Sequence, residues 1–419
     1  MGSLRLDGVR IIDGSGAPPL DDGVILIEGE RLSYVGARAA APTALADQVL
    51  DLSGMTALPG LTDLHVHSTF DADMRAYLAH GVTSIRYAGI TQQAAATMAQ
   101  RIQPGELPGP RVFSCGPMLD MAPPAYPEWT SVLETPEDAA REAARLIDEE
   151  HVDALIATQR ITAPLLQAIV ETAHQRGVPV TGQILWVDGG EAAEIGIDGL
   201  ENTSRIFVSR DYPPERLFQY HSIPHRLAMV GRAWASVDWG LTERILDSMA
   251  RRGVRYCPTL VVMLACLGDL DETLANDPSY ATFGERERAN WSGFRNRISH
   301  EWSDEDRQYW RRAMDNQREW IRRFRALGGS IVSGTDMQFG GLTFSLELEQ
   351  LQQCGMSPME VLVAATSEAA RALGRESEQG TLVAGTLADV LVVDGDPLAD
   401  LGALRRVAQV VKQGELVAL

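Results

Sequence analysis

The stretch "PGLTDLHVHSTF", residues 59–70, places His65 and His67 two positions apart at the end of a short apolar run. In a β-strand, side chains two positions apart leave the backbone on the same face, so both imidazoles can turn toward one point. Two imidazoles at that spacing suit zinc or a related divalent ion, or they can transfer protons near neutral pH. The stretch therefore predicts a metal site or an acid–base site at the end of this strand.

Further short apolar runs follow this one, and amphipathic helices alternate with them. This alternation is typical of a parallel α/β arrangement. The predicted strands are residues 62–67, 83–88, 111–116, 154–159, 178–185, 199–203, 255–262 and 330–336. Eight such units predict a (β/α)8 barrel, and the charged, aromatic stretch at about 265–327 predicts a helical insertion over its mouth.

The two ends of the chain share a different pattern. Both contain short runs of Val, Ile and Leu separated by Gly and Asp turns, which is typical of β-strands. We expect residues 1–58 and 376–419 to form one composite β-sandwich domain, and residues 59–375 to form the barrel. Helix starts are expected at Thr135 with Pro136, and at Ser357 with Pro358.

The composition excludes several functional classes. The chain has 419 residues, 45% of them apolar, and a formal net charge of −20. A surplus of acidic groups repels nucleic acids and anionic membrane surfaces, so neither is expected as a partner. The sequence shows no secretion signal and no apolar run long enough to span a bilayer, which favours a cytoplasmic location. The scattered cysteines predict neither disulfides nor a thiolate zinc site.

Several motifs together resemble the amidohydrolase superfamily, nearest its imidazolonepropionase-like and prolidase-like members. They include "PGLTDLHVH", "GVTSIRYAG", "GPRVFSCG", "VSGTD" and the C-terminal "GTLADVLVVDGDPL". The resemblance implies a distorted barrel with a terminal β-sandwich, and a metal site at the carboxyl ends of the strands. It also implies a small-molecule substrate with an amide, lactam or similar carbonyl, and an assembly that can be a homodimer.

The resemblance further implies a set of ligands that this chain retains only in part. The superfamily's strand-four lysine corresponds to Ile156, and Lys412 is the only lysine in the chain. Gln183 stands where strand five would supply a histidine, and Asn202 stands where strand six would supply another. A centre bridged by a carboxylated lysine is therefore excluded.

The positions that match the superfamily's ligands are His65, His67 and Asp336, which we predict as catalytic and as ligands of at most one divalent metal, zinc or similar. The resemblance implies that Asp336 takes the proton of the attacking water. A carboxylate beside a cation stays ionised and can act as such a base.

Further polar residues are candidates for contacts with substrate. Gln183 and Asn202 keep amides of similar shape to the lost histidines, Tyr87 follows the second predicted strand, and Arg160 follows the fourth. His221 and His225 follow the sixth strand. The predicted substrate-binding residues are Gln183, Asn202, Tyr87, Arg160, His221 and His225.

Three functions remain open from the sequence. The first is a hydrolase of a C–N bond that uses one metal and Asp336 as general base. The second is a barrel enzyme without a metal, a cyclase, dehydratase or isomerase that uses His65, His67 and Asp336 as acid and base. The third is a non-catalytic protein that binds a small ligand in the same pocket.

Overall fold

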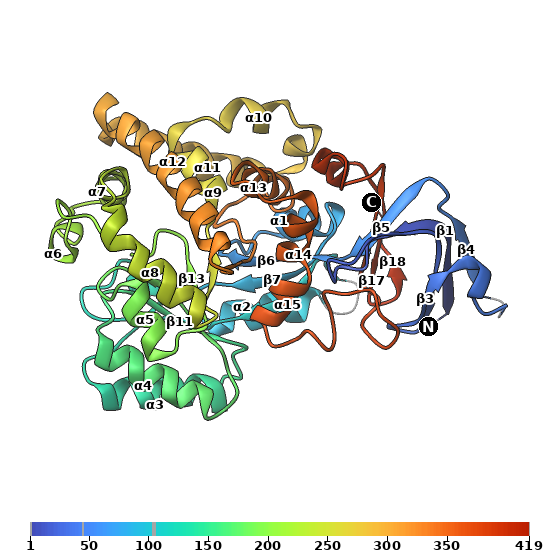
Figure 1. Cartoon of the computed structure of the whole chain (residues 1–419), viewed down its shortest axis with the longest axis horizontal. Coiled ribbons are helices and arrows are strands. Elements are labelled where there is room, and N and C mark those ends of the chain that lie inside the picture. Colours follow the sequence, from blue (N-terminus) through green and yellow to red (C-terminus); the bar gives the residue numbers. More distant parts are fainter. Residues whose placement is uncertain (1, 44–45, 103–105, 419) are drawn as a thin grey trace.

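A computed structural model describes residues 2–43, 46–102 and 106–418 of the chain. Figure 1 shows a β-sheet region that contains both termini, beside a larger region in which strands and helices alternate. Over these residues, no helix combines the length and the apolarity needed to cross a membrane. The four cysteines are buried and free, as expected.

Strands from the two ends of the chain pair in one sheet. Its order is β18-β17-β16-β5-β1-β2-β3, and β4 pairs with β1. The strands are β1 (Ser3–Ile11), β2 (Leu20–Glu28), β3 (Arg31–Ala37), β4 (Gln48–Asp51), β5 (Met55–Pro59), β16 (Val390–Asp394), β17 (Val407–Lys412) and β18 (Glu415–Leu416). The central contact is antiparallel, between β5 and β16, with Leu58 opposite Leu391. One apolar core joins residues 4–57 with residues 382–411.

The remaining strands form two parallel sheets, β6-β7-β8 and β10-β9-β11-β12-β13-β14-β15. They are β6 (Leu61–Val66), β7 (Val82–Tyr87), β8 (Arg111–Ser114), β9 (Met118–Asp120), β10 (Thr130–Val132), β11 (Leu155–Gln159), β12 (Val180–Ile184), β13 (Gly199–Glu201), β14 (Arg255–Cys257) and β15 (Ser330–Ile331). Each of the eight predicted strands overlaps one of them. The expected parallel α/β arrangement is therefore confirmed.

Backbone hydrogen bonds connect both edge strands of the three-stranded sheet, β6 and β8, to the seven-stranded sheet. Leu64 N on β6 donates to Ser333 O after β15 at 3.1 Å, and Ala154 N before β11 donates to Ser114 O on β8 at 3.3 Å. Since all these strands are parallel, their carboxyl ends face the same side of the molecule.

Helices connect the strands, and several begin as predicted. Thr135 and Ser357 each cap a helix through a reciprocal capping box, with Pro136 and Pro358 in the first turn. The helices are α1 (Asp71–Ala79), α2 (Gln92–Ile102), α3 (Pro136–Asp148), α4 (Ala163–His174), α5 (Gly189–Ile195), α6 (Pro214–Leu217), α7 (Ile223–Ala235), α8 (Trp239–Arg251), α13 (Leu342–Gln353), α14 (Pro358–Ala365) and α15 (Ser367–Ala372).

A long helical segment follows β14, where the sequence predicted an insertion. It contains α9 (Leu260–Leu267), α10 (Asp271–Asn276), α11 (Glu285–Glu301) and α12 (Asp304–Ala326). In Figure 1 these helices lie together, α12 in orange, and α7 lies beside α12. The indole of Trp310 on α12 donates to Met263 O on α9 at 2.9 Å, which fastens two of these helices to each other.

Candidate functional site

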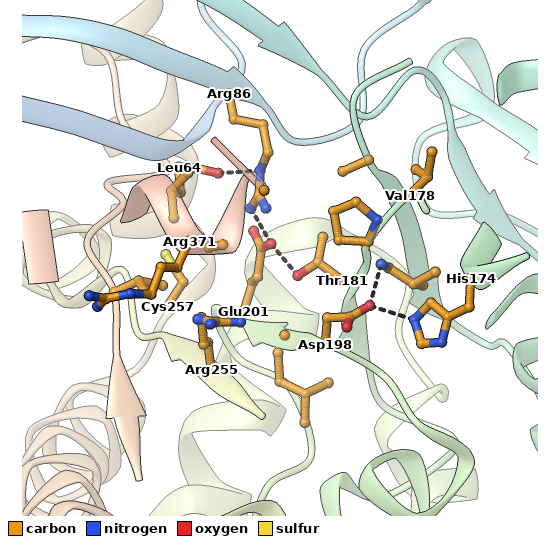
Figure 2. A pocket seen from close by; sticks show the side chains of 18 of the residues that line it. Leu64, Arg86, His174, Val178, Thr181, Asp198, Glu201, Arg255, Cys257 and Arg371 are labelled. Carbon is orange, nitrogen blue, oxygen red and sulfur yellow. Dashed lines mark hydrogen bonds and ion pairs between the residues drawn. The ribbon is translucent and has the colours of Figure 1, made fainter. Parts of the chain in front are cut away.

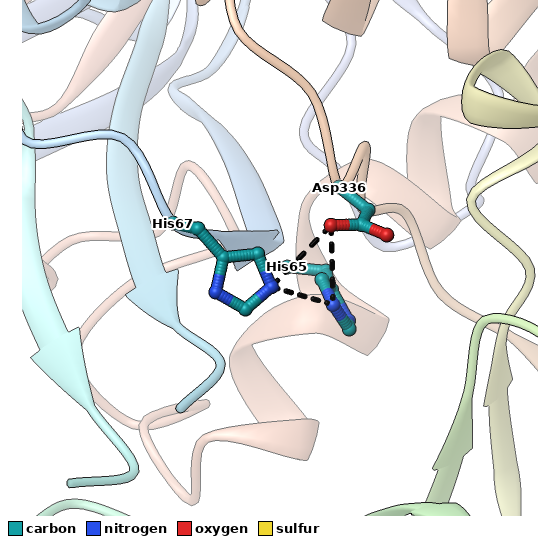
Figure 3. A group of neighbouring side chains, drawn as sticks. All are labelled: His65, His67 and Asp336. Carbon is teal, nitrogen blue, oxygen red and sulfur yellow. Dashed lines mark hydrogen bonds and ion pairs between the residues drawn. The ribbon is translucent and has the colours of Figure 1, made fainter. Parts of the chain in front are cut away.

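His65, His67 and Asp336 converge at the carboxyl ends of β6 and β15. The Nε2 atoms of the two histidines lie 3.2 Å apart. Asp336 Oδ1 lies 3.3 Å from His67 Nε2 and 3.8 Å from His65 Nε2. Figure 3 shows the carboxylate facing the two rings. The structure thus brings together the three side chains that the sequence analysis predicted as one site.

The backbone fixes the position of Asp336. Its N–H donates to the carbonyl of His65 at 2.8 Å, which ties the end of the eighth predicted strand to β6. Its φ is +54°, a left-handed conformation that non-glycine residues adopt rarely and that often marks a functional site. Asn202, with a φ of +52°, donates from Nδ2 to Asp336 Oδ2 at 2.5 Å. One carboxylate oxygen is therefore held by an amide while the other faces the histidines.

Glu201 on β13 supports His65 from the interior. Its Oε2 accepts a hydrogen bond from His65 Nδ1 at 2.5 Å. Its Oε1 accepts from Arg86 on β7 and from Thr181 on β12, as Figure 2 shows. Both side chains of the Arg86–Glu201 pair are almost fully buried, so each charge depends on the other. The pair holds an ionised carboxylate behind the histidine.

These contacts set the charges of the site. Burial alone raises the pKa of Glu201, but the charge of Arg86 and the hydrogen bond from His65 outweigh it and lower that pKa. Burial lowers the pKa of His65, but Glu201 outweighs it and raises that pKa. The pKa of Asp336 is lowered because the histidines and Asn202 outweigh its burial. Both carboxylates are therefore ionised near neutral pH.

The geometry fits a single divalent metal. A tetrahedral zinc ion with ligands at about 2.0–2.1 Å places its ligand atoms about 3.3 Å apart. The separations of 3.2, 3.3 and 3.8 Å match the edges of such a tetrahedron within about half an ångström. Catalytic zinc sites commonly hold three protein ligands and one open position. The Glu201 contact adds the carboxylate that orients many histidine ligands. His67 Nδ1, in contrast, is buried and has no hydrogen-bond partner among the residues that the structure describes.

The positions that depart from the superfamily's ligand set have different surroundings. Ile156 on β11 is fully buried in an apolar cluster with Ala88 and Cys115. Lys412 lies on β17 of the terminal sheet, far along the chain from the site. Gln183 on β12 and Asn202 both line the cavity beside Asp336. Gln183 and Asn202 are thus part of the site, whereas Ile156, at the position that corresponds to the superfamily's lysine, is part of the apolar core.

A cavity of about 470 Å³ opens beside Asp336 and His67. Its apolar wall comes from α11, α12, β9 and the segments after the first and third predicted strands, and includes Phe70, Met118, Trp129, Trp291, Phe294 and Trp310. Trp129 stacks on His67, with ring centroids 6.0 Å apart and planes within 7°. A second cavity, about 370 Å³, lies at the amino ends of β12–β14. The first is the candidate active site, because two members of the triad, His67 and Asp336, line it at the carboxyl ends of the strands.

Four of the predicted substrate contacts lie outside the residues that line this cavity. Tyr87 is buried, and its hydroxyl donates to Ser68 O at 2.9 Å. The guanidinium of Arg160 lies 4.3 Å from the ring centroid of Phe218.

The rings of His221 and His225 contact each other at a tilt of 35°, with centroids 4.1 Å apart, and the side chain of His221 is 74% exposed. The pair lies at the start of α7, where Glu301 Oε2 approaches His221 to 3.9 Å.

The sequence analysis did not predict that Arg86, Thr181 and Glu201 support the site. For Arg86 and Glu201, however, the sequence does contain a signal. Arg86 and Glu201 each interrupt an apolar run in a predicted inner strand. Such residues are almost never buried unless they are paired, so the two interruptions predict a buried ion pair. Trp129 and Arg226, which also line the cavity, carry no comparable signal because they lie in an irregular segment and a helix.

Comparisons with known proteins agree with the fold. A family model described as "Amidohydrolase family" matches residues 56–417. The imidazolonepropionase of Arthrobacter sp. (strain FB24) is 44% identical over 57 residues, which are 14% of this chain and only 14% of that enzyme.

Among solved structures, a putative prolidase from Bifidobacterium longum superposes with a TM-score of 0.73 at 23% identity, covering 100% of this chain and 95% of that one. A bottromycin amidohydrolase superposes with a TM-score of 0.74 at 20% identity, covering 99% and 86%. At these identities the likeness to both structures establishes the fold alone.

Proposed function

Because the chain belongs to the amidohydrolase family, we propose that it hydrolyses a C–N bond in a small molecule, with His65, His67 and Asp336 holding at most one divalent metal. One observation carries the proposal. A nitrogen of each histidine and an oxygen of Asp336 all lie within 4.8 Å of one another, and His67 and Asp336 line a cavity large enough for a small ligand.

The protein's own residues have separate roles in this proposal. The bound ion would polarise the scissile carbonyl and lower the pKa of a water molecule. Asp336, whose Oδ1 faces the histidines, accepts the proton of the attacking water on its carboxylate and returns it to the leaving nitrogen. Asn202 keeps the other oxygen of Asp336 in place, and Glu201 keeps the proton of His65 on Nδ1 so that Nε2 is free. Gln183 contributes an amide that can bind the substrate.

We also infer how the chain is divided. The eight strands β6, β7, β8, β11, β12, β13, β14 and β15 would form one distorted (β/α)8 barrel spanning residues 59–375, closed by the bonds between the two parallel sheets. Residues 1–58 and 376–419 would form the composite β domain. Support comes from its separate apolar core, whose members all fall within these two ranges.

A metal-independent reaction is the second candidate, and the same contacts favour it. With His65 Nδ1–H bound to Glu201, Nε2 of His65 is an acceptor, and His67 Nε2–H can donate to it or to Asp336. Two imidazoles and a carboxylate can share and move a proton without an ion. The unpartnered Nδ1 of His67 also leaves one ligand less well oriented than metal sites usually provide.

The metal content of the purified protein separates these candidates. We expect about one zinc or similar ion per chain, loss of amide hydrolysis after a chelator, and recovery when zinc or manganese is returned. The Asp336→Asn variant should lose hydrolysis by about 10²–10⁴-fold while remaining folded. Activity in a metal-free, chelated protein would exclude the hydrolase as proposed and support the acid–base enzyme. Activity unchanged in both His65→Ala and Asp336→Ala would exclude both.

A further inference from the structure

Arg226, in the first turn of α7, is a buried charge that the catalytic triad does not use. Only 3% of its surface is exposed. Its Nη2 donates to the hydroxyl of Tyr126 at 3.3 Å, and no ion pair joins it to a carboxylate in the described part of the chain. Its Nε and Nη1 are buried and lack any hydrogen-bond partner there. The guanidinium therefore has two free donor positions.

The cavity beside the triad is where these donors can be satisfied. Arg226 lines it together with Asp336, His67 and Asn202. Tyr126 stacks on Trp129, which stacks on His67, so a continuous row of rings connects the guanidinium to the triad. Arginine stays protonated in proteins and is costly to bury without a counter-charge. An anion that enters this cavity would supply that counter-charge.

The charges of the other lining residues favour an anion. Asp336 is the only carboxylate among the described residues that line the cavity, and its oxygens already face His67 and Asn202. Arg297 of α11 adds a second positive charge at the exposed side. The cavity therefore has one negative group, Asp336, at the triad and two positive groups, Arg226 and Arg297, away from it. This local excess of positive charge contrasts with the protein's net charge of −20.

We propose that Arg226 binds a carboxylate of the substrate, and that the substrates are small amides carrying one carboxylate and one apolar side chain, such as N-acylated apolar amino acids. The inference rests on the proposed function for the identity of the bond that is cleaved. A planar guanidinium with two free N–H groups matches a carboxylate through two parallel hydrogen bonds. The aromatic wall of Trp129, Trp291 and Phe294 supplies the surface for the apolar side chain.

Matched pairs of ligands test this assignment by calorimetry on the full-length protein. The probes are the N-acetyl derivatives of phenylalanine, leucine, methionine and tryptophan, each as the free acid and as the primary amide. We expect the wild-type protein to bind at least one acid about 10–100-fold more tightly than its amide. Arg226→Met should abolish that preference, and Arg226→Lys should keep part of it. Arg244→Met, which removes an exposed arginine on α8, should keep all of it.

Two outcomes would overturn the assignment: no preference for any acid in the wild-type protein, or an unchanged preference in Arg226→Met. The first needs no variant, so it stands even if a substitution impairs folding. Cleavage of the N-acetyl bond is followed separately, as release of the amino acid from the acid probes and of the amino acid amide from the amide probes. Preferential binding of acids without hydrolysis in the zinc-loaded protein would refute the proposed function and leave Arg226 assigned. Hydrolysis of these probes by a wild-type protein that shows no binding preference for any acid would support the proposed function and refute the assignment of Arg226.

Discussion

Glu201 Oε2 lies 2.5 Å from Nδ1 of His65, so a buried carboxylate on β13 fixes the ring of a histidine at the end of β6. The contact assigns the proton of the neutral imidazole to Nδ1 and leaves Nε2 free toward Asp336 and His67. The triad that the sequence identifies thus depends on a buried residue that is not part of the lining of the cavity beside Asp336 and lines the second cavity instead.

Replacing Glu201 should weaken metal binding. In Glu201→Gln the amide cannot fix the tautomer of His65 in the same way, so we expect the affinity for zinc to fall about 10–100-fold. The measurement is competition with a chromogenic chelator, at a temperature where circular dichroism shows the variant to be folded.

Arg86→Gln is the matched control for Glu201→Gln. It removes the other charge of the same buried Arg86–Glu201 pair but keeps the hydrogen bond between Glu201 and His65. Both variants should lose stability, by about 3–5 kcal/mol, because each leaves one buried charge alone. Only Glu201→Gln should lose zinc affinity. Equal losses in the two variants would mean that the effect follows stability, and that Glu201 has no separate role toward His65.

Asn202 should tune the pH dependence of the reaction. Its amide donates to Asp336 Oδ2 and helps to lower the pKa of that carboxyl. In Asn202→Ala this pKa should rise, because the ionised form loses a hydrogen bond. A base must be ionised to act, so the acidic limb of the kcat/KM profile should move to higher pH.

Thr203→Val is the control for this shift. It changes the next residue, which lines the same cavity, and leaves the bond from Asn202 to Asp336 in place. Its profile should keep the wild-type acidic limb. A profile for Asn202→Ala that coincides with it would show that Asp336 is not the group that titrates.

The elements of the site that the sequence could predict are those that depend on local patterns. The periodicity of apolar runs located the start of each strand to within two residues, as at Leu61–Val66 for a predicted 62–67. The predicted strands 255–262 and 330–336 are too long, because β14 ends at Cys257 before the helix α9 and β15 ends at Ile331. Two histidines at strand spacing gave one part of the triad, and the resemblance to the superfamily added the aspartate at the end of the last strand. What local patterns cannot give is the partner of a side chain. Arg226 comes from a helix, and only the tertiary structure places its unpaired donors in the cavity.

Glu347 on α13 should make the stability depend on pH. It is fully buried, and its Oε2 accepts a hydrogen bond from Val261 N at 2.7 Å. Burial raises the pKa of its carboxyl from 4.5 to about 8. Between these two pKa values the carboxyl of Glu347 is therefore protonated in the folded protein and ionised in the unfolded chain. Stability should fall as the pH rises between these two values, by up to about 1.4 kcal/mol per pH unit, and level off above the higher one.

Glu347→Gln should remove the pH dependence that comes from Glu347. The free energy of unfolding of this variant relative to wild type, measured by urea unfolding, should therefore increase steadily as the pH rises from 4.5 to about 8. Glu349→Gln serves as the control, since Glu349 is partly exposed and pairs with Arg405 at 2.6 Å. Its effect should stay within about 1 kcal/mol and vary little with pH. A constant difference between Glu347→Gln and wild type at every pH would mean that Glu347 titrates at its ordinary value.

Gly231 on α7 should tolerate no side chain, because Trp310 of α12 packs directly against it. A Cβ at this position would lie 2.3 Å from Cε3 of Trp310. The indole is 1% exposed and is bound to Met263 O, so it cannot move away without losing that hydrogen bond. Although alanine favours a helix over glycine by about 1 kcal/mol, we expect Gly231→Ala to lower the free energy of unfolding by about 1–3 kcal/mol.

Gly240→Ala on α8 is the matched control, because the nearest atom to its Cβ is Asp238 Oδ1 at an ordinary 3.6 Å. That variant should be neutral or up to about 1 kcal/mol more stable. Urea denaturation compares the two variants, with an unchanged m-value as the sign that only stability has changed. Gly231→Ala should also bind acid probes more weakly, since Trp310 and Arg226 line the same cavity. Equal stability of the two variants would mean that α7 and α12 can separate, and that the cavity wall between them is not rigid.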